Sequence, residues 1–280
     1  MVARVWGCRG SLPTPGESTV RYGGNTTCVE VRCDDASTVI LDAGTGIKRL
    51  GDVLGSSAEI HVLLTHLHLD HLEGLRFFAP LWQAEGEVHI WGPPSPVHSL
   101  QERIARSFSP PLFPVDLGDI PATVVFHDVP DEPWELDGIR ILAQPVSHPG
   151  STVGFRLEHA GRSLAFIPDH EPVLGVELAA LEPDWVSGHG LAHEVDVLLH
   201  DSQFTEDEYP DRVGWGHSSV AHAVGFARKA NAGRLVLFHH DPDRTDVEVD
   251  RLTERAAELW DGNGAPAPLA AREGMTIDLA

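Results

Sequence analysis

Cysteine is scarce in this chain of 280 residues, which contains only Cys8, Cys28 and Cys33. An odd number of cysteines without Cys-x-x-Cys spacing is not typical of a protein built on disulfides. We therefore expect reduced thiols in the core or in loops, and a cytoplasmic protein.

Basic residues are also few. The chain has 20 lysines and arginines against 42 acidic residues, which gives a formal net charge of −22. Such an excess of negative charge disfavours broad electrostatic binding to nucleic acid or to an anionic membrane, although it allows a local basic pocket. We expect a small-molecule partner and no large nucleic acid.

Long hydrophobic runs are missing as well. No apolar stretch approaches the length that spans a membrane. The first residues, Met1 to Cys8, do not form a basic leader followed by an apolar run. The sequence therefore predicts neither a signal peptide nor a membrane partner.

The remaining composition is that of a globular protein. Hydrophobic residues make up 42% of the chain and charged residues 22%, while 27 glycines and 21 prolines indicate many short turns. A chain of this length can form one large domain or two small ones, and no low-complexity linker divides it. We expect a β-containing, loop-rich single domain over residues 1–280.

The most informative segment is His66-x-His68-x-Asp70-His71, which gathers metal-binding side chains within a few residues. Imidazole nitrogen and carboxylate oxygen suit Zn²⁺ and its neighbours Mn²⁺, Fe and Co, and an open coordination position can hold a reactive water. The alternative is a polar loop that happens to be rich in histidine. The specific spacing favours a metal site.

Short apolar segments with strand character recur along the chain, and polar residues follow several of them. Residues 38–41 end at Asp42, and residues 59–65 run into the histidine segment. Further strands are predicted at 29–32, 88–91, 139–144, 154–157, 163–167 and 234–238, and helices at 72–83, 218–230 and 247–260. Residues capable of chemistry therefore collect where strands end.

The histidine segment after a strand, the upstream Asp42-Ala-Gly-Thr-Gly46, and later isolated His and Asp residues at strand ends resemble the metallo-β-lactamase superfamily. The resemblance covers nearly the whole chain. It implies an α/β (α+β) fold, namely an αββα sandwich of two mixed β-sheets flanked by helices, with a dinuclear metal site along one edge.

The resemblance also implies a complete ligand set for two divalent ions, most suitably Zn²⁺, with Mn²⁺ or Fe as alternatives. One ion would be held by His66, His68 and His148, the other by Asp70, His71 and His239, with Asp169 and a hydroxide between them. For His148 and for Asp169 the alternative is a residue that merely stands in a turn, and we favour the ligand role for both.

Two neighbouring positions compete for the last ligand role. His240 follows His239 directly, and adjacent strand residues face opposite ways, so one of the two should point at the metal unless the strand has ended. We favour His239 because the apolar strand leads directly into it. Asp42 is expected either to accept a hydrogen bond from a ligand imidazole or to cap the following turn.

The segments His200-Asp201-Ser202 and Trp215-Gly-His217-Ser-Ser219 are similar to the phosphodiesterase branch of the superfamily, which includes tRNase Z. In that branch an acidic residue orients a histidine that gives a proton to the leaving oxygen. Asp201 and His217 would take these roles, and we name Asp70, Asp201 and His217 as catalytic residues. The alternative is that His217 caps the following helix while Asp201 stands in a turn.

The expected activity is hydrolysis of a small phosphodiester, with cyclic nucleotides as one class, by a hydroxide between two metals. Within the same fold the rivals are a lactonase or other C–O or C–N hydrolase, and a tRNase Z-like nuclease. The nuclease is disfavoured by the negative charge and by the lack of a Lys- and Gly-rich arm. A di-iron redox or sensor module is the alternative outside hydrolysis, and a homodimer stays among the expected assemblies.

Overall fold

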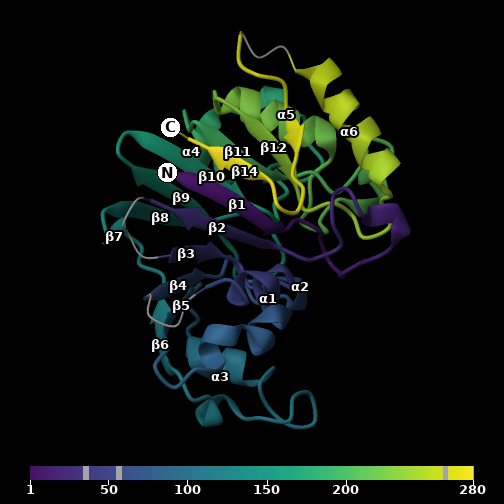
Figure 1. Cartoon of the computed structure of the whole chain (residues 1–280). Coiled ribbons are helices and arrows are strands. Elements are labelled where there is room, and N and C mark those ends of the chain that lie inside the picture. The colour runs from purple at the N-terminus through teal and green to yellow at the C-terminus, as the bar shows by residue number, and fades with distance from the viewer. Residues whose placement is uncertain (34–37, 55–58, 261–263, 280) are drawn as a thin grey trace.

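The computed structural model describes residues 1–33, 38–54, 59–260 and 264–279. Within these ranges the chain forms two seven-stranded sheets. In Figure 1 the strands lie between one group of helices that contains α1, α2 and α3 and another that contains α5 and α6. The predicted αββα sandwich of the metallo-β-lactamase fold is confirmed.

The first sheet has the strand order β14-β1-β2-β3-β4-β5-β6. Its strands are β1 (Val2–Gly7), β2 (Cys28–Arg32), β3 (Thr38–Leu41), β4 (Ile60–Leu63), β5 (Glu87–Gly92), β6 (Thr123–Asp128) and β14 (Thr276–Asp278). The helices in this half of the chain are α1 (Gly46–Gly51), α2 (Leu69–Leu72) and α3 (Leu100–Ala105).

The second sheet has the order β13-β12-β11-β10-β9-β8-β7. Its strands are β7 (Trp134–Leu136), β8 (Ile139–Pro145), β9 (Val153–His159), β10 (Arg162–Ile167), β11 (Val197–Asp201), β12 (Leu235–Phe238) and β13 (Leu269–Ala270). Its helices are α4 (His189–Ala192), α5 (Val220–Lys229) and α6 (Asp246–Leu259).

Both sheets are mixed, and they repeat one pattern. An antiparallel run (β1 to β3, and β7 to β10) passes into a parallel run (β3 to β6, and β10 to β13). Parallel strands deliver their carboxyl ends to the same edge of a sheet, and in open α/β sheets ligands bind beyond those ends. The site is therefore expected beyond β3, β4, β10, β11 and β12.

Among the residues that the structure describes, the hydrophobic core has three parts. Residues of both sheets, such as Leu41 and Phe166, pack together between the sheets. A second cluster, with Ile47, lies under α1 and α3, and a third, with Phe226, lies under α4, α5 and α6. Because helices cover the outer faces, β3 and β4 are buried on both sides, which agrees with their largely apolar sequences.

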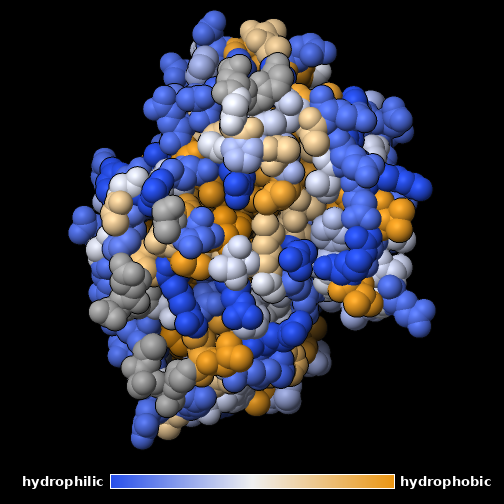
Figure 2. All heavy atoms as spheres, turned by 45° about the horizontal axis from the view of Figure 1, so that its top comes forward, coloured by the Kyte–Doolittle hydropathy of each residue, from blue (hydrophilic) through white to orange (hydrophobic). Residues whose placement is uncertain are grey.

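Surface character agrees with the composition. Figure 2 shows hydrophilic residues spread over one face of the molecule, with hydrophobic residues in patches between them. Among the helices of the described ranges, none is long and apolar enough to cross a membrane.

The expected helix over 72–83 is wrong. A short helix α2 gives way to 3₁₀ turns at Glu73–Phe77 and Ala79–Trp82. The amide of Gly74 donates to Ala43 O at 3.0 Å, and His71 O accepts from the amide of Ala43 at 2.8 Å. Because these backbone groups bond to the turn after β3, they are not available to continue the helix.

The strand predicted at 29–32 forms as β2, and it carries a buried charged residue, Glu30. Its carboxylate accepts a hydrogen bond of 2.9 Å from the Trp6 indole, so the cost of burial is offset within the first sheet.

Candidate functional site

The predicted ligands come together at the carboxyl ends of strands from both sheets. The histidine segment follows β4, whereas His148, Asp169 and His239 follow β8, β10 and β12. The ligand atoms form two groups, and within each group they lie within 4.8 Å of one another. The groups are His66, His68 and His148, and Asp70, His71, Asp169 and His239.

Asp169 stands between the two groups. Its Oδ2 lies 3.8 Å from His66 Nε2 and 3.7 Å from His148 Nε2. Its Oδ1 lies 3.0 Å from His71 Nε2 and 3.2 Å from His239 Nε2. One carboxylate thus presents one oxygen to each group, which is the arrangement of a ligand shared by two cations.

The hydrogen bonds of His71 and His66 determine which ring nitrogen carries the proton. His71 Nδ1 lies 2.7 Å from Asp42 Oδ2, and an ionised carboxylate can only accept, so this nitrogen is the donor. His66 Nδ1 lies 3.0 Å from Thr65 Oγ1, which donates its own proton to Asp42. Both rings therefore keep the lone pair of Nε2 free.

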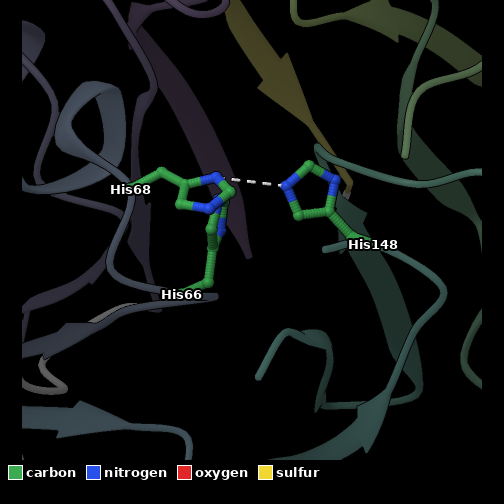
Figure 3. Close-up of side chains that lie close together, drawn as sticks. All are labelled: His66, His68 and His148. Carbon is green, nitrogen blue, oxygen red and sulfur yellow. Dashed lines mark hydrogen bonds between the residues drawn. The ribbon is translucent and has the colours of Figure 1, made fainter. Parts of the chain in front are cut away.

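His148 and His239 have the same arrangement. Nδ1 of His148 donates to Gly216 O at 2.8 Å, and Nδ1 of His239 donates to Gln203 Oε1 at 3.2 Å. Figure 3 shows the rings of His148 and His68 turned toward each other, with His148 Nε2 at 3.2 Å from His68 Nδ1. Nε2 of His148 and of His239 therefore keep their lone pairs, and in this structure Nε2 of His148 accepts from His68 Nδ1.

Several of these atoms have no hydrogen-bond partner among the described residues although they are buried. They are His66 Nε2, His71 Nε2 and Asp169 Oδ1. His71 Nε2 and Asp169 Oδ1 are close enough for a hydrogen bond, but their relative orientation does not allow one. An unsatisfied buried polar atom costs roughly 1 to 3 kcal/mol, and a cation among these atoms would satisfy all of them. The residues present therefore fit a dinuclear metal site.

Charge supports the same conclusion. Burial by itself raises the pKa of Asp169, but the positive charges of His239 and His71 lower it well below its usual value. For His71, burial lowers the pKa, yet the charges of Asp169, Asp70 and Asp42 raise it well above its usual value. Without a cation this negative field draws a second proton onto Nε2 of His71, and a bound divalent cation would take the place of that proton.

The backbone decides between His239 and His240. β12 ends at Phe238, and His239 has a φ of 59°, in the left-handed region. This turn places the His239 ring 3.2 Å from Asp70 Oδ2. His240 instead bonds to Ala271 O through its side chain and to Cys8 O through its amide. The structure therefore places the His239 ring in the cluster and leaves His240 outside it.

Asp201 and His217 lie beside the predicted metal ligands. His217 Nδ1 is 2.7 Å from Asp201 Oδ2, and the His217 ring stacks on His239 with 5.0 Å between ring centres. Burial lowers the pKa of His217, but the charge of Asp201 and the hydrogen bond to it raise this pKa to about 9. The helix that follows is capped by Ser219, whose hydroxyl accepts from the amide of His222, so His217 is not its cap.

Asp42 binds His71, a predicted metal ligand, and does not serve the turn alone. Besides the bond to His71, its Oδ1 accepts hydrogen bonds from the amide and hydroxyl of Thr65 at 2.8 and 3.0 Å. It adopts a φ of 61°, which non-glycine residues rarely do without compensation. The expectation that Asp42 orients an imidazole agrees with this geometry.

A separate group of possible ligands, Glu59, His61 and His89, lies at the amino end of β4, opposite the main cluster. Trp91 Nε1 can only donate, and it bonds to His61 Nδ1 at 3.2 Å. The proton of neutral His61 is therefore on Nε2, the atom that faces Glu59. Because that nitrogen has no lone pair to offer, we assign no metal to this group.

Two residues that support the ligands were not found from the sequence. Gln203 accepts from His239, and Gly216 accepts from His148 through its carbonyl. Gln203 lies two residues after Asp201, but nothing in its type marks it as a partner of a ligand. A backbone carbonyl has no sequence signal at all.

Two mixed sheets with converging histidines and carboxylates at their strand ends define a metal-dependent hydrolase of the metallo-β-lactamase fold. The chain belongs to the metallo-β-lactamase superfamily, because residues 37–240 match the family described as the beta-lactamase superfamily domain. This membership confirms the resemblance on which the ligand set was predicted, whereas the ligand and catalytic roles of individual residues stay predictions.

Sequence similarity relates the chain to one group of proteins within the superfamily. Ribonuclease Z of Myxococcus xanthus is 26% identical over 284 residues, covering 86% of this chain and 88% of that protein. Ribonuclease Z of Mycolicibacterium paratuberculosis is 28% identical over 248 residues, covering 80% and 82%. The chain is a distant relative of ribonuclease Z.

Two solved structures share the fold of this chain. The metallo-beta-lactamase fold protein YhfI from Bacillus subtilis superposes with a TM-score of 0.74 at 17% identity, covering 99% of this chain and 98% of that chain. The short form of human tRNase Z gives 0.71 at 20% identity and covers 100% of both chains. At these identities the likeness shows the fold alone.

Metal analysis tests the ligand set. We expect the wild-type protein reconstituted with Zn²⁺ to hold about two equivalents and His239→Gln to hold about one, because His239 offers a free Nε2 to one group. His240→Gln should hold both ions and serves as the matched control. The measurement is elemental analysis after dialysis. Loss of an ion from His240→Gln but not from His239→Gln would contradict the assignment.

Proposed function

We propose that the protein is a metal-dependent phosphodiesterase that acts on a small phosphodiester. The observation that carries this proposal is the His217–Asp201 pair beside the predicted ligands, with 2.7 Å between His217 Nδ1 and Asp201 Oδ2. Cleavage of a phosphodiester releases an alkoxide, which is a poor leaving group unless it receives a proton. A positioned imidazolium supplies that proton.

The chain's own residues prepare the reaction. The imidazoles and carboxylates of the two groups hold the ions, and Zn²⁺ is proposed because this nitrogen and oxygen donor set suits it. When bound, two such ions lower the pKa of a water and polarise the phosphoryl oxygen. Asp201 keeps its hydrogen bond to Nδ1 of His217, so the proton delivered to the leaving oxygen comes from Nε2.

A cavity beside His217 suits a small substrate. Its volume is about 450 Å³, within the range of small-molecule sites. Arg212 supplies positive charge there, with its guanidinium 4.9 Å from the Phe204 ring centre. The lining residues are Ser11, Gln203, Phe204, Arg212, Trp215, His217, Asp241, Pro242 and Asp243. Together with the net charge of −22, this cavity favours a small ester over a long polyanion.

RNA cleavage is the second candidate, because the relatives named above are called ribonuclease Z. The mechanism would be shared, since both reactions expel an alkoxide from phosphorus. The difference lies in the size and charge of the substrate. A lactonase is less well supported, because it has less need for a proton donor paired with a buried carboxylate.

A substrate panel tests the proposal directly. Metal-loaded protein is assayed with bis(p-nitrophenyl) phosphate, cyclic nucleotides, a tRNA precursor, lactones and a β-lactam. We expect turnover of the small phosphodiesters and little cleavage of the tRNA precursor. Turnover of lactones or the β-lactam alone would show that the phosphodiesterase proposal is wrong, and preferred cleavage of the tRNA precursor would favour the nuclease.

Replacing the proposed proton donor should reduce activity to a degree that depends on the leaving group of the substrate. We expect His217→Ala to lose about 10²- to 10⁴-fold in kcat on a cyclic nucleotide, whose leaving group is an alkoxide. The loss on bis(p-nitrophenyl) phosphate should be much smaller, since p-nitrophenolate leaves without a proton. His193→Ala, at an exposed histidine, is the control. Equal losses on both substrates would mean that His217 does not act as the acid.

The pH dependence tests Asp201. The negative charge of Asp201 raises the pKa of His217, and cations bound nearby would lower it again. A general acid is lost as pH rises through its pKa, so Asp201→Asn should move the alkaline limb of kcat/KM to lower pH. The measurement is a pH–rate profile on a cyclic nucleotide. An alkaline limb at the same pH in both proteins would contradict the proposed pairing.

A further inference from the structure

Glu171 is a fully buried carboxylate two residues after Asp169. Its Oε1 accepts from the Tyr209 hydroxyl at 2.8 Å and from the amide of Gly214 at 2.9 Å. Its Oε2 accepts from the amides of Gly214 and Gly216 at 3.0 and 2.9 Å. A buried carboxylate is costly unless hydrogen bonds stabilise its charge, and here two of the donors belong to one loop.

That loop is shaped by its glycines. Gly214 and Gly216 have φ values of +85° and +87°, in the region that favours glycine. A Cβ at Gly216 would lie 2.5 Å from His148 Nδ1 and 2.3 Å from Pro149 Cδ. The loop therefore packs closely against the segment of His148, and both glycine amides reach the same carboxylate.

The same loop connects to both kinds of functional histidine. Gly216 O accepts the Nδ1 proton of His148, and His217 is the next residue along the chain. The amide of Glu171 also donates to Ser147 O at 2.9 Å, directly before His148. One side chain thus holds the carbonyl that orients a predicted metal ligand and the backbone that carries the predicted proton donor.

We infer that Glu171 is a positioning residue that sets the orientation of His148 and His217 together. The part that concerns proton transfer rests on the proposed phosphodiesterase function, whereas the part that concerns His148 rests on the metal site alone. Glu171 does not contact the reacting atoms in this role. It acts through the amides of Gly214 and Gly216.

A carboxylate is needed because the loop offers only donors. Glutamine at this position would place an NH₂ group where one oxygen now accepts from a glycine amide, so two donors would face each other. The loop would then shift, and the Gly216 carbonyl would no longer hold the His148 ring. Partners that orient metal-ligating histidines typically change metal affinity by about 10- to 100-fold when removed.

The test is Glu171→Gln with two readouts. By competition with a chromophoric chelator, we expect one of the two Zn²⁺ ions to bind about 10- to 100-fold more weakly than in the wild type. We also expect a larger loss of kcat on a cyclic nucleotide than on bis(p-nitrophenyl) phosphate, because His217 is misplaced. In a Glu171→Gln/His217→Ala double variant, the extra loss of kcat on the cyclic nucleotide should be no larger than in His217→Ala alone, because both changes act through His217.

Glu30→Gln is the matched control. Glu30 is also a buried carboxylate, but it accepts from Trp6 within the first sheet rather than from the loop of Gly216. This variant should lower the Tm without changing metal affinity or the ratio of the two kcat values. If Glu171→Gln behaves in the same way as Glu30→Gln, the inference is overturned.

Glu171→Asp covers the case in which the glutamine variant does not fold. Aspartate keeps the negative charge, but its shorter side chain places the carboxylate oxygens farther from the glycine amides. We expect the same weaker Zn²⁺ binding and the same leaving-group-specific loss of kcat, both smaller than in Glu171→Gln. Wild-type metal affinity together with wild-type dependence on leaving group would overturn the inference. If the wild type hydrolyses no phosphodiester, the proposed function fails, while the metal affinity of the variants still decides the role of Glu171 toward His148.

Discussion

The shared carboxylate of Asp169 is the constraint on which the rest of the site depends. It presents one oxygen to His66 and His148 and the other to His71 and His239. This geometry requires side chains at strand ends of both sheets to lie 3.0 to 3.8 Å from one carboxylate. The sandwich allows this, because each sheet delivers the carboxyl ends of its parallel strands to the same edge.

Around this carboxylate the fold places hydrogen-bond acceptors beside Nδ1 of these imidazole rings, the nitrogen that faces away from the cluster. Asp42 accepts from His71, Gly216 O from His148, and Gln203 from His239. Each acceptor holds a ring in one tautomer, so that Nε2 is free for a cation. The two residues after Asp169 also support the site. The amide of His170 donates to Asp201, and the Glu171 side chain accepts from the amide of Gly216, next to His217.

The sequence predicted best what lies close together along the chain. The segment from His66 to His71 needs only one strand end to bring its side chains to one place, and its spacing alone indicated a metal. The two-sheet fold followed from the family resemblance and is confirmed. The predicted helix over 72–83 failed because Gly74 and His71 bond to the turn at Ala43, a contact across 28 to 31 positions that periodicity cannot show.

The sequence by itself determined which residue types stand at these places: histidine and aspartate after β4, β8, β10 and β12, Asp201 at the end of β11, and His217 shortly before α5. The tertiary structure decided which atoms meet. A left-handed turn at His239 selects it over His240, and backbone groups such as Gly216 O orient the rings. The physical reason is that these choices depend on backbone dihedrals and on carbonyl and amide positions, which every residue type shares and only packing of distant segments can place.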